Sequence, residues 1–390
     1  MNAELFTKML ADKNFLDLKK LSYKYPQVDI KKFVSLLGQS FYKKIPLKDF
    51  KGKEIVFLES HASFHLSAVK TLLNPQETKG SYGIKAMEEE IAYTLLIEQV
   101  DFSRESVGEI MAGRAPKSEG EERIYGMKKG LDFISSAENL ITVENIYKLY
   151  SLAIASCLRE EDRLLPGKKY RHDSVFVVGS KLEHTGLPHE KLMTYMADFV
   201  CFINEESGIN DLSKAAVIHY YLAYLHPYFD GNGRMARLLH LWYLVQKGYP
   251  SALFVTLSEH IEKSRDAYYK AYSQIHKNSL LSGLTDITPF LIYFNDNVYS
   301  KLDLNKPGKN LTESFNSHVE QGKVTLKEKE LWLFAVSAYG FEEFSTKRLE
   351  RDFNNAAYAT IRSFVLKFEE FGLLSSKRYG NRVRYKIKED

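Results

Sequence analysis

Residues 226–237 carry the densest chemistry in the chain, in the order His226-Pro-Tyr-Phe-Asp230-Gly231-Asn232-Gly233-Arg234-Met-Ala-Arg237. The glycines on either side of the asparagine can take backbone conformations closed to other residues and can turn several N–H groups into one concavity. Residues 235–245 follow as a strong helix former with apolar side chains nearly all round, which predicts a central, buried helix. Because the N-terminus of such a helix offers free N–H donors, the stretch predicts an anion site.

The charged side chains of this stretch suit phosphate chemistry. Arg234 and Arg237 are three residues apart, so both project from one face of the first helical turn, where guanidinium forks can bind phosphate oxygens. Asp230 offers a carboxylate beside them for a Mg²⁺ ion. His226 is the one group here that can accept a proton near neutral pH. A lone histidine before proline is usually a surface or capping residue, and a lone Gly-x-Gly is usually a turn, but seven specified residues together argue against both.

The stretch resembles the signature of the Fic family, His-x-Phe-x-(Asp/Glu)-Gly-Asn-Gly-Arg-x-x-Arg, with Tyr228 in place of the phenylalanine. The exchange keeps an aromatic ring and should be tolerated if its hydroxyl finds a partner. The resemblance implies a mainly α fold, a Fic-type helical bundle with a small β-hairpin flap. It also implies transfer of AMP from ATP to a Tyr, Thr or Ser hydroxyl of a target protein. The Doc branch, which phosphorylates, departs in the Gly-Asn-Gly segment, so AMP transfer is favoured.

The resemblance also implies a role for each matching residue. The general base is His226, the Mg²⁺ ligand is Asp230, the α- and β-phosphates are bound by Gly231, Asn232 and Gly233, the β-phosphate by Arg234 and the γ-phosphate by Arg237.

Residues 94–99 read Thr-Leu-Leu-Ile-Glu-Gln and resemble the inhibitory-helix motif of the family, (Ser/Thr)-x-x-x-Glu-(Gly/Asn), in the branch where this helix precedes the signature. Gln99 departs from the usual Gly or Asn. The simplest interpretation is a solvated helix glutamate. However, in a helix near 86–100 Glu98 shares a face with apolar residues, and a carboxylate there needs a partner. We therefore expect Glu98 to capture Arg237 and inhibit the enzyme.

A strand-like segment stands among the predicted helices at residues 174–178, after the Gly-x-x-x-Arg stretch 167–171. From the pattern alone it is a surface hairpin. The resemblance implies a flap over which the target segment lies extended, so that main-chain bonds position its hydroxyl. The expected docking residues are Val175, Phe176, Val177 and Val178.

Three parts are predicted: an N-terminal extension over 1–85, the catalytic domain over 86–305 and a winged-helix-like domain over 310–390, with a linker at 306–309. The last part combines helices with a basic hairpin that turns at Gly380-Asn381. One interpretation is DNA binding, and the alternative is an interaction or homodimer module with a solvated hairpin. The expected DNA contacts are Arg362, Lys377, Arg378, Arg382 and Arg384.

Composition sets the remaining limits. The chain has 390 residues with 44% apolar content, enough for two or three domains, and a net charge of +4, too small by itself to imply a nucleic-acid partner. Cys157 and Cys201 are expected to be buried free thiols. The N-terminus lacks the apolar core of a signal peptide and no run is long enough to span a membrane, so a cytoplasmic protein is expected. The resemblance to the Fic family implies ATP as substrate and Mg²⁺ as cofactor. Two rival functions stay open: removal of AMP at the same site, and a nucleotide-sensing, DNA-binding regulator.

Overall fold

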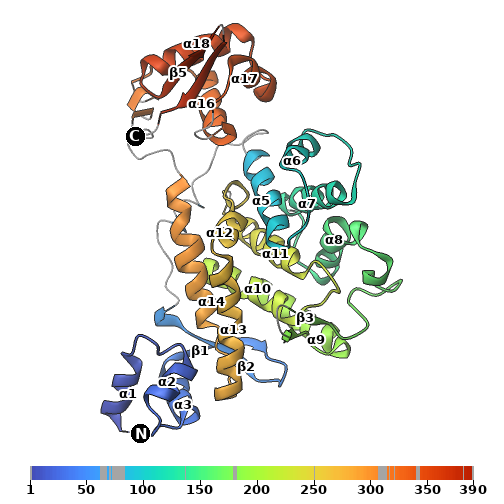
Figure 1. The fold of residues 1–390 in the computed structure, drawn as a ribbon, viewed down its shortest axis with the longest axis vertical. Helices are drawn as coiled ribbons and strands as arrows, with labels where there is room; N and C mark the ends of the chain where they lie inside the picture. Colours follow the sequence, from blue (N-terminus) through green and yellow to red (C-terminus); the bar gives the residue numbers. More distant parts are fainter. Residues whose placement is uncertain are drawn as a thin grey trace.

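The computed structural model describes residues 2–61, 68–69, 72, 84–136, 138–178, 182–249, 251–305, 314–315, 317–319, 321–339, 343–380 and 382–388. Helices dominate this part of the chain and its strands are short, so the expected mainly α class is confirmed (Figure 1). None of the described helices is long and apolar enough to cross a membrane. The predicted linker at 306–309 lies outside the described residues.

The N-terminal helices form a small unit with its own apolar core, which includes Phe33 and Leu37. Each helix starts at a side chain that accepts a hydrogen bond from a backbone N–H of the first turn, which satisfies a donor the helix leaves free. An antiparallel hairpin follows and packs on the central bundle. The bounds are α1 (Ala3–Leu10), α2 (Leu18–Lys24), α3 (Ile30–Ser40), β1 (Tyr42–Lys48) and β2 (Glu54–Leu58).

The central bundle is helical apart from one hairpin, β3 (Phe176–Val178) and β4 (Leu182–Thr185). A π-helical turn at Phe294–Val298 and a 3-10 turn at Tyr299–Asn305 continue its last helix. The helices are α5 (Ile84–Ile97), α6 (Arg104–Met111), α7 (Glu119–Ser135), α8 (Val143–Ala153), α9 (Leu192–Asn204), α10 (Asp211–Leu225), α11 (Asn232–Gln246), α12 (Leu257–Lys263), α13 (Arg265–Ser282) and α14 (Thr288–Tyr293).

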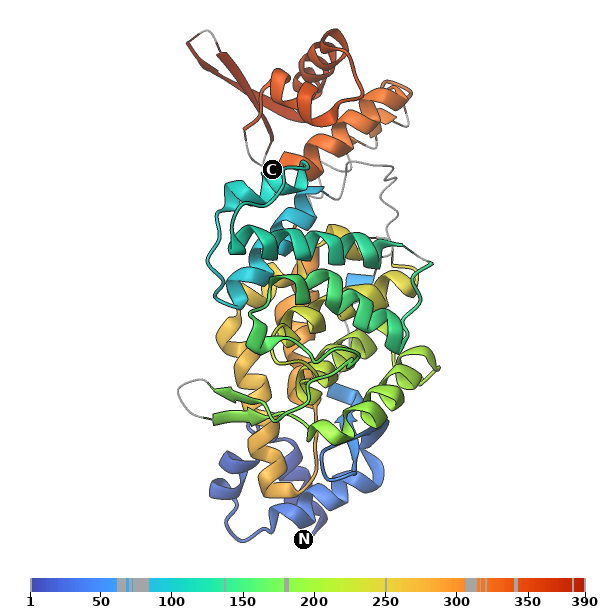
Figure 2. The same ribbon diagram turned by 90° about the vertical axis from the view of Figure 1, so that its right-hand side faces the viewer.

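Helices α10 and α11 lie at the centre of this bundle. The side chains of α11 are buried from Arg234 to Leu244, and those of α10 from Leu212 to Leu222, so the buried helix expected over 235–245 is confirmed. A helix without an exposed face needs neighbours on every side, and Figures 1 and 2 show the other helices around this pair. The loop between the two helices is the 226–231 stretch, so the fold holds it between buried elements.

The prediction of two buried cysteines is wrong. Cys157 is half-buried and Cys201 is exposed, and both are free thiols. Helix α9 buries a stripe that includes Met196, Phe199 and Ile203, and Cys201 lies on its opposite face.

The C-terminal lobe has its own core, separate from that of the bundle. Among the described residues of this lobe, helices are followed by a hairpin whose turn includes Gly380, and Phe344 adds a short bridge to Tyr385 of the hairpin. Helix α16 of this lobe contacts α5. The winged-helix interpretation and the domain boundaries stay predictions. The bounds are α16 (Leu326–Tyr339), α17 (Thr346–Phe353), α18 (Tyr358–Glu370), β5 (Leu374–Tyr379) and β6 (Arg382–Ile387).

Candidate active site

His226 ends α10 and is held in an unusual backbone conformation. It is the residue after Leu225, its N–H still bonds to Leu222 O at 3.0 Å, and its φ is +54°, in the left-handed region. The ring Nδ1 lies 3.3 Å from Ala223 O. A carbonyl can only accept, so this contact requires Nδ1 to carry the proton, and the lone pair of a neutral ring then lies on Nε2. The geometry therefore suits Nε2 for accepting a proton.

Asn232 closes the loop between the two helices with its side chain. Its Oδ1 accepts from Tyr228 N at 3.0 Å, and its Nδ2 donates to Tyr228 O at 2.8 Å. The amide group is therefore committed to the loop, and the backbone N–H is the part of Asn232 left for a phosphate. Gly231 supports the same turn with a φ of +84°, and a Cβ there would lie 2.4 Å from Ile154 Cγ2. Glycine satisfies both requirements at no steric cost.

Tyr228 does not meet the condition set for its tolerance. Its ring is fully buried and stacks on Tyr150 with centroids 3.7 Å apart. The hydroxyls of both tyrosines are buried and have no hydrogen-bond partner among the described residues. The condition is thus not met among the described residues, because the stacking that fits a phenylalanine ring leaves the hydroxyl in the core.

Arg234 and Asp230 form one ion pair, with Nη2 3.0 Å from Oδ2. The Arg234 side chain is only 3% exposed, and its Nε and Nη1 are buried with no hydrogen-bond partner in the described part of the chain. Unpaired donors on a buried cation are costly unless an acceptor arrives, so they mark a place for an anion oxygen.

Asp230 could bind the expected Mg²⁺ ion only as a single carboxylate ligand that acts together with substrate phosphates. Its side chain is 46% exposed, and Oδ1 already accepts from Gly231 N at 2.5 Å. The described residues contain no group of three or more His, Cys, Asp or Glu that could hold a metal ion. Mg²⁺ commonly binds through one or two carboxylates together with substrate phosphates, so a single carboxylate beside Arg234 suffices for that mode.

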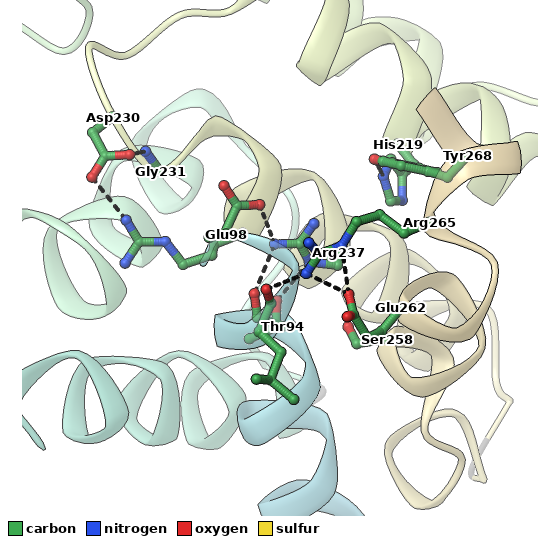
Figure 3. A network of polar contacts seen from close by, with 12 residues as sticks. Thr94, Glu98, His219, Asp230, Gly231, Arg237, Ser258, Glu262, Arg265 and Tyr268 are labelled. Atoms are coloured by element: carbon green, nitrogen blue, oxygen red, sulfur yellow. Dashed lines mark hydrogen bonds and ion pairs between the residues drawn. The ribbon is translucent and has the colours of Figure 1, made fainter. Parts of the chain in front are cut away.

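Arg237 is buried, and the Nε and Nη2 atoms of its guanidinium contact Thr94 of α5 and Glu98, the residue after α5 (Figure 3). Its Nη2 lies 2.5 Å from Glu98 Oε1 and 3.3 Å from Thr94 O, and its Nε donates to Thr94 Oγ1 at 2.6 Å. The two arginines of the stretch thus have different partners, although they leave the same helical turn.

The Glu98 carboxylate also covers the first turn of α11. A Cβ built on Gly233 would lie 2.4 Å from Glu98 Oε1 and 3.4 Å from Arg237 Nη1. The carboxylate therefore lies directly against the glycine at the helix N-terminus, where the sequence predicted an anion. A negative group is favoured there by the free N–H donors of the turn.

Glu98 lies just past the end of its helix, which stops at Ile97 rather than near residue 100 as predicted. Gln99 has a φ of +56°, its N–H bonds to Leu96 O at 3.0 Å, and the N–H of Val100 bonds to Leu95 O at 3.0 Å. This is the Schellman arrangement, in which the left-handed residue is usually Gly or Asn. It accounts for the Gly or Asn that the family motif has where this chain has Gln99.

Two residues that hold α5 were missed in the sequence. Glu90 is buried and accepts from Ser258 N at 2.9 Å and from the Ser258 hydroxyl, and burial raises the pKa of its carboxyl. Arg265 donates to Leu96 O and pairs with Glu262. Glu90 lies two helical turns before Glu98, and this spacing could have indicated the contact of Glu90 with another helix. No pattern near Arg265 indicated its contact with Leu96.

The predicted flap forms the hairpin β3–β4, which projects from the bundle in Figure 2. Phe176 pairs with Thr185 and is 58% exposed, while Val175 precedes the strand. The side chains of Val177 and Val178 lie outside the described residues. In the described part of the chain no third strand pairs with this hairpin, so its main-chain edges offer places for an added strand.

The residues proposed to contact DNA lie in the C-terminal lobe. The strand register places those of the hairpin on two opposite faces. Lys377 faces Arg384 across the hairpin, and Arg382 faces Tyr379 on the same side. Arg378 pairs with Val383 and so points to the other face of the sheet. Arg362 is exposed on α18.

The comparisons with known proteins concern the part of the chain that contains this site. Residues 140–244 match the family model described as "Fic/DOC family", and the match includes the whole 226–237 stretch. Over these residues the chain is similar to the Fic/DOC family. The chain is 27% identical over 193 residues to protein adenylyltransferase fic-1 of Caenorhabditis briggsae, covering 48% of this chain and 33% of the relative. It is 28% identical over 186 residues to protein adenylyltransferase Fic of Drosophila willistoni, covering 46% and 33%.

The chain thus spans about a third of the length of those curated relatives. A solved Fic family protein from Desulfovibrio desulfuricans G20 has a TM-score of 0.51 at 17% identity, with 84% of this chain and 98% of that chain covered. At that identity the likeness concerns the fold.

Proposed function

We propose that this protein is a protein adenylyltransferase that transfers AMP from ATP to a hydroxyl of a target protein and is inhibited by its own Glu98. The observation that carries the proposal is the position of the Glu98 carboxylate. It lies against Gly233 and pairs with Arg237, so a carboxylate of the chain fills the place predicted for ATP phosphates. The names of the curated relatives support the same reaction.

The proposed reaction uses few groups. The target hydroxyl oxygen attacks the α-phosphorus, its proton passes to His226 Nε2, and the bond from the α-phosphorus to the bridging oxygen breaks, so pyrophosphate leaves with the electron pair. The free donors of Arg234 and the N-terminus of α11 neutralise the phosphate charge. A Mg²⁺ ion at Asp230 would add charge neutralisation when bound.

Inhibition follows from the competition for Arg237. While Glu98 Oε1 lies 2.5 Å from Arg237 Nη2, the guanidinium is not available to the γ-phosphate. The γ-phosphate would also be repelled by the Glu98 carboxylate. ATP would then bind without the orientation that in-line attack requires. Release of Glu98 restores the cation and clears the helix N-terminus.

The test compares wild type with Glu98→Gly and Glu98→Gln, using ATP labelled at the α-phosphate and a cell lysate that contains the target. We expect both variants to label target or themselves well above wild type, since both remove the charge, and a second change, His226→Ala, to abolish the gain. Equal labelling by the three proteins, with ATP binding shown by calorimetry, would refute the inhibition. Loss of label from a modified target during a chase would instead indicate removal of AMP.

We also propose, as a separate function of the C-terminal lobe, binding of duplex DNA by the face that carries Lys377, Arg382 and Arg384. The support is that three cations lie on one side of a two-stranded hairpin, close enough to follow a phosphate backbone. Fluorescence anisotropy with a duplex should give binding that weakens steeply with salt. The double variant Lys377→Glu/Arg384→Glu should abolish it, whereas the change Arg378→Glu, on the opposite face, should have a smaller effect. Binding that ignores the double variant would favour the homodimer or partner-protein alternative.

A further inference from the structure

Arg171 is a buried cation whose guanidinium donates hydrogen bonds to backbone carbonyls. Arg171 is only 2% exposed. In the described part of the chain no carboxylate lies within ion-pair distance of its guanidinium. Its Nε donates to His226 O at 2.8 Å, its Nη1 to Asp173 O at 2.5 Å, and its Nη2 to Leu187 O. Burying a guanidinium for three neutral acceptors is expensive, so the arrangement calls for a reason beyond packing.

The three carbonyls belong to parts of the chain that the proposed function needs together. Asp173 and Leu187 are in the two segments that enter and leave the flap hairpin, and His226 is the proposed base. Backbone bonds join the same segments: Arg171 N donates to Pro227 O at 3.0 Å, and Leu187 N to Leu225 O at 3.1 Å.

Gly186 shows how close these groups lie. A Cβ on this glycine would be 2.7 Å from Arg171 Nη2, 2.7 Å from Val175 Cγ1 and 3.2 Å from His226 Cβ. The flap, the guanidinium and the proposed base are therefore in contact at one point.

The backbone of His226 needs such support. A residue with a Cβ in the left-handed region costs about 1–2 kcal/mol, and the chain on either side of His226 could relax to a commoner conformation. Such a relaxation would turn the His226 carbonyl and swing the imidazole with it. The Arg171 side chain donates to the His226 carbonyl, and the Arg171 backbone N–H donates to the Pro227 carbonyl. Both bonds hold the backbone in place.

We propose that Arg171 is a positioning residue that holds His226 in its left-handed conformation and ties it to both ends of the flap. The orientation of the base and the place where an acceptor strand docks are then set by one guanidinium. This proposal rests on the proposed function for its catalytic meaning, but the geometry it describes can be measured without catalysis.

The test uses Arg171→Lys in both the wild-type and the Glu98→Gly protein. Lysine keeps the charge, but one ammonium cannot span three carbonyls in the planes that a guanidinium reaches. The first readout is the rate at which diethyl pyrocarbonate modifies His226, followed on its peptide by mass spectrometry without nucleotide. The second is label transfer, with kcat and the KM for ATP measured separately.

We expect the His226 modification rate to change severalfold and kcat to fall by about tenfold to a hundredfold, with the KM for ATP within about twofold, since the phosphate contacts come from other residues. Arg163→Lys is the matched control, because Arg163 also donates to a backbone carbonyl, Leu158 O, but not at the flap. Gly186→Ala is the second variant: it keeps the guanidinium, displaces it, and should give the same pattern.

An unchanged His226 modification rate in Arg171→Lys and Gly186→Ala, both shown folded by their melting curves, would overturn the proposal. So would a loss of transfer with unchanged His226 reactivity, which would assign Arg171 to the fold alone. If Glu98→Gly with Arg171 intact transfers no label, the proposed function fails, and the modification rates still decide whether Arg171 positions His226.

Discussion

His226 is separated from the proposed phosphate-binding residues in both position and chemistry. The ring leaves the end of α10, whereas the groups proposed for phosphates come from the first turn of α11. In the Glu98→Gly protein, His226→Ala should therefore lower label transfer by about 10²–10⁴-fold while ATP still binds, because removal of a general base commonly costs that much. Filter assays for transfer and calorimetry for ATP binding check both parts. Near-normal transfer by the variant would remove His226 from the mechanism.

Tyr228 shows a single atom that the fold does not accommodate. Its buried hydroxyl has no described partner, whereas the hydroxyl of the equally buried Tyr221 donates to Lys48 O at 2.8 Å. We expect Tyr228→Phe to leave the free energy of unfolding unchanged or raise it by about 1 kcal/mol, and Tyr221→Phe to lower it by about 1 kcal/mol. Urea unfolding of the three proteins measures the difference. Destabilisation by Tyr228→Phe comparable to that by Tyr221→Phe would show that the Tyr228 hydroxyl is bonded.

At the level of elements, the backbone at the end of α5 is strained. The Gly or Asn of the family motif would adopt the same conformation at a lower free-energy cost. Gln99 has a Cβ in the left-handed conformation, which costs about 1 kcal/mol relative to glycine. Gln99→Gly should stabilise the closed arrangement that places Glu98 on Arg237, and so lower basal labelling by up to about fivefold. Gln99→Ala, which keeps a Cβ, is the control and should label like wild type. Labelling raised by Gln99→Gly would mean that flexibility at this position outweighs the relief of strain.

The pairing of α10 with α11 buries two histidines, His219 and His240, whose rings are 5.7 Å apart. Burial lowers the pKa of His240 to about 3, against 6.5 for an exposed imidazole. Between these values the unfolded chain binds one proton more than the folded chain, so this residue makes the protein lose stability as the pH falls from 6.5 towards 3. From pH 7 to pH 4 its share is about 3 kcal/mol.

We therefore expect His240→Gln to weaken the pH dependence of unfolding by about that amount, while its amide still donates to the Tyr299 hydroxyl that His240 Nε2 contacts at 3.0 Å. Urea unfolding at pH 7, 5.5 and 4 measures the slope. His276→Gln, at an exposed site in α13, is the control. Parallel curves for wild type and His240→Gln would show that His240 is not buried as a neutral ring.

For the whole molecule, the described apolar residues fall into three separate clusters, one in the N-terminal helices, one in the bundle and one in the C-terminal lobe. Separate cores predict more than one unfolding transition in calorimetry. In the Glu98→Gly protein, ATP with Mg²⁺ should raise the melting temperature of the transition that contains α11, since saturation at about 100 times Kd adds about 2.7 kcal/mol. The transition of the C-terminal lobe should stay in place. A single transition that moves as a unit would show that the contact between α16 and α5 makes one cooperative body.

The sequence alone determined the features that depend on neighbouring residues. The 226–237 stretch specified a turn with glycines, a helix N-terminus and two arginines, because those groups are covalently close and have few ways to fold. Burial of α11 followed from its apolar side chains on every face. The order of helices and hairpin in the C-terminal lobe followed from local patterns of the same kind. The fold class and the resemblance to the Fic family could therefore be stated before any contact was known.

Apart from the pair of Glu98 and Arg237, which the family resemblance led us to expect, only the tertiary structure decided the contacts between distant residues. Glu90 meets Ser258, Arg265 meets Leu96, and Arg171 meets His226, in each case across at least 55 residues of chain. Burial of the Tyr228 hydroxyl and the left-handed backbone at Gln99 were equally hidden from the pattern. The physical reason is that periodicity specifies which face of a helix is buried, but not which side chain of another element lies opposite it. That choice is made by packing, where many weak contacts and a few buried polar groups must be satisfied at once.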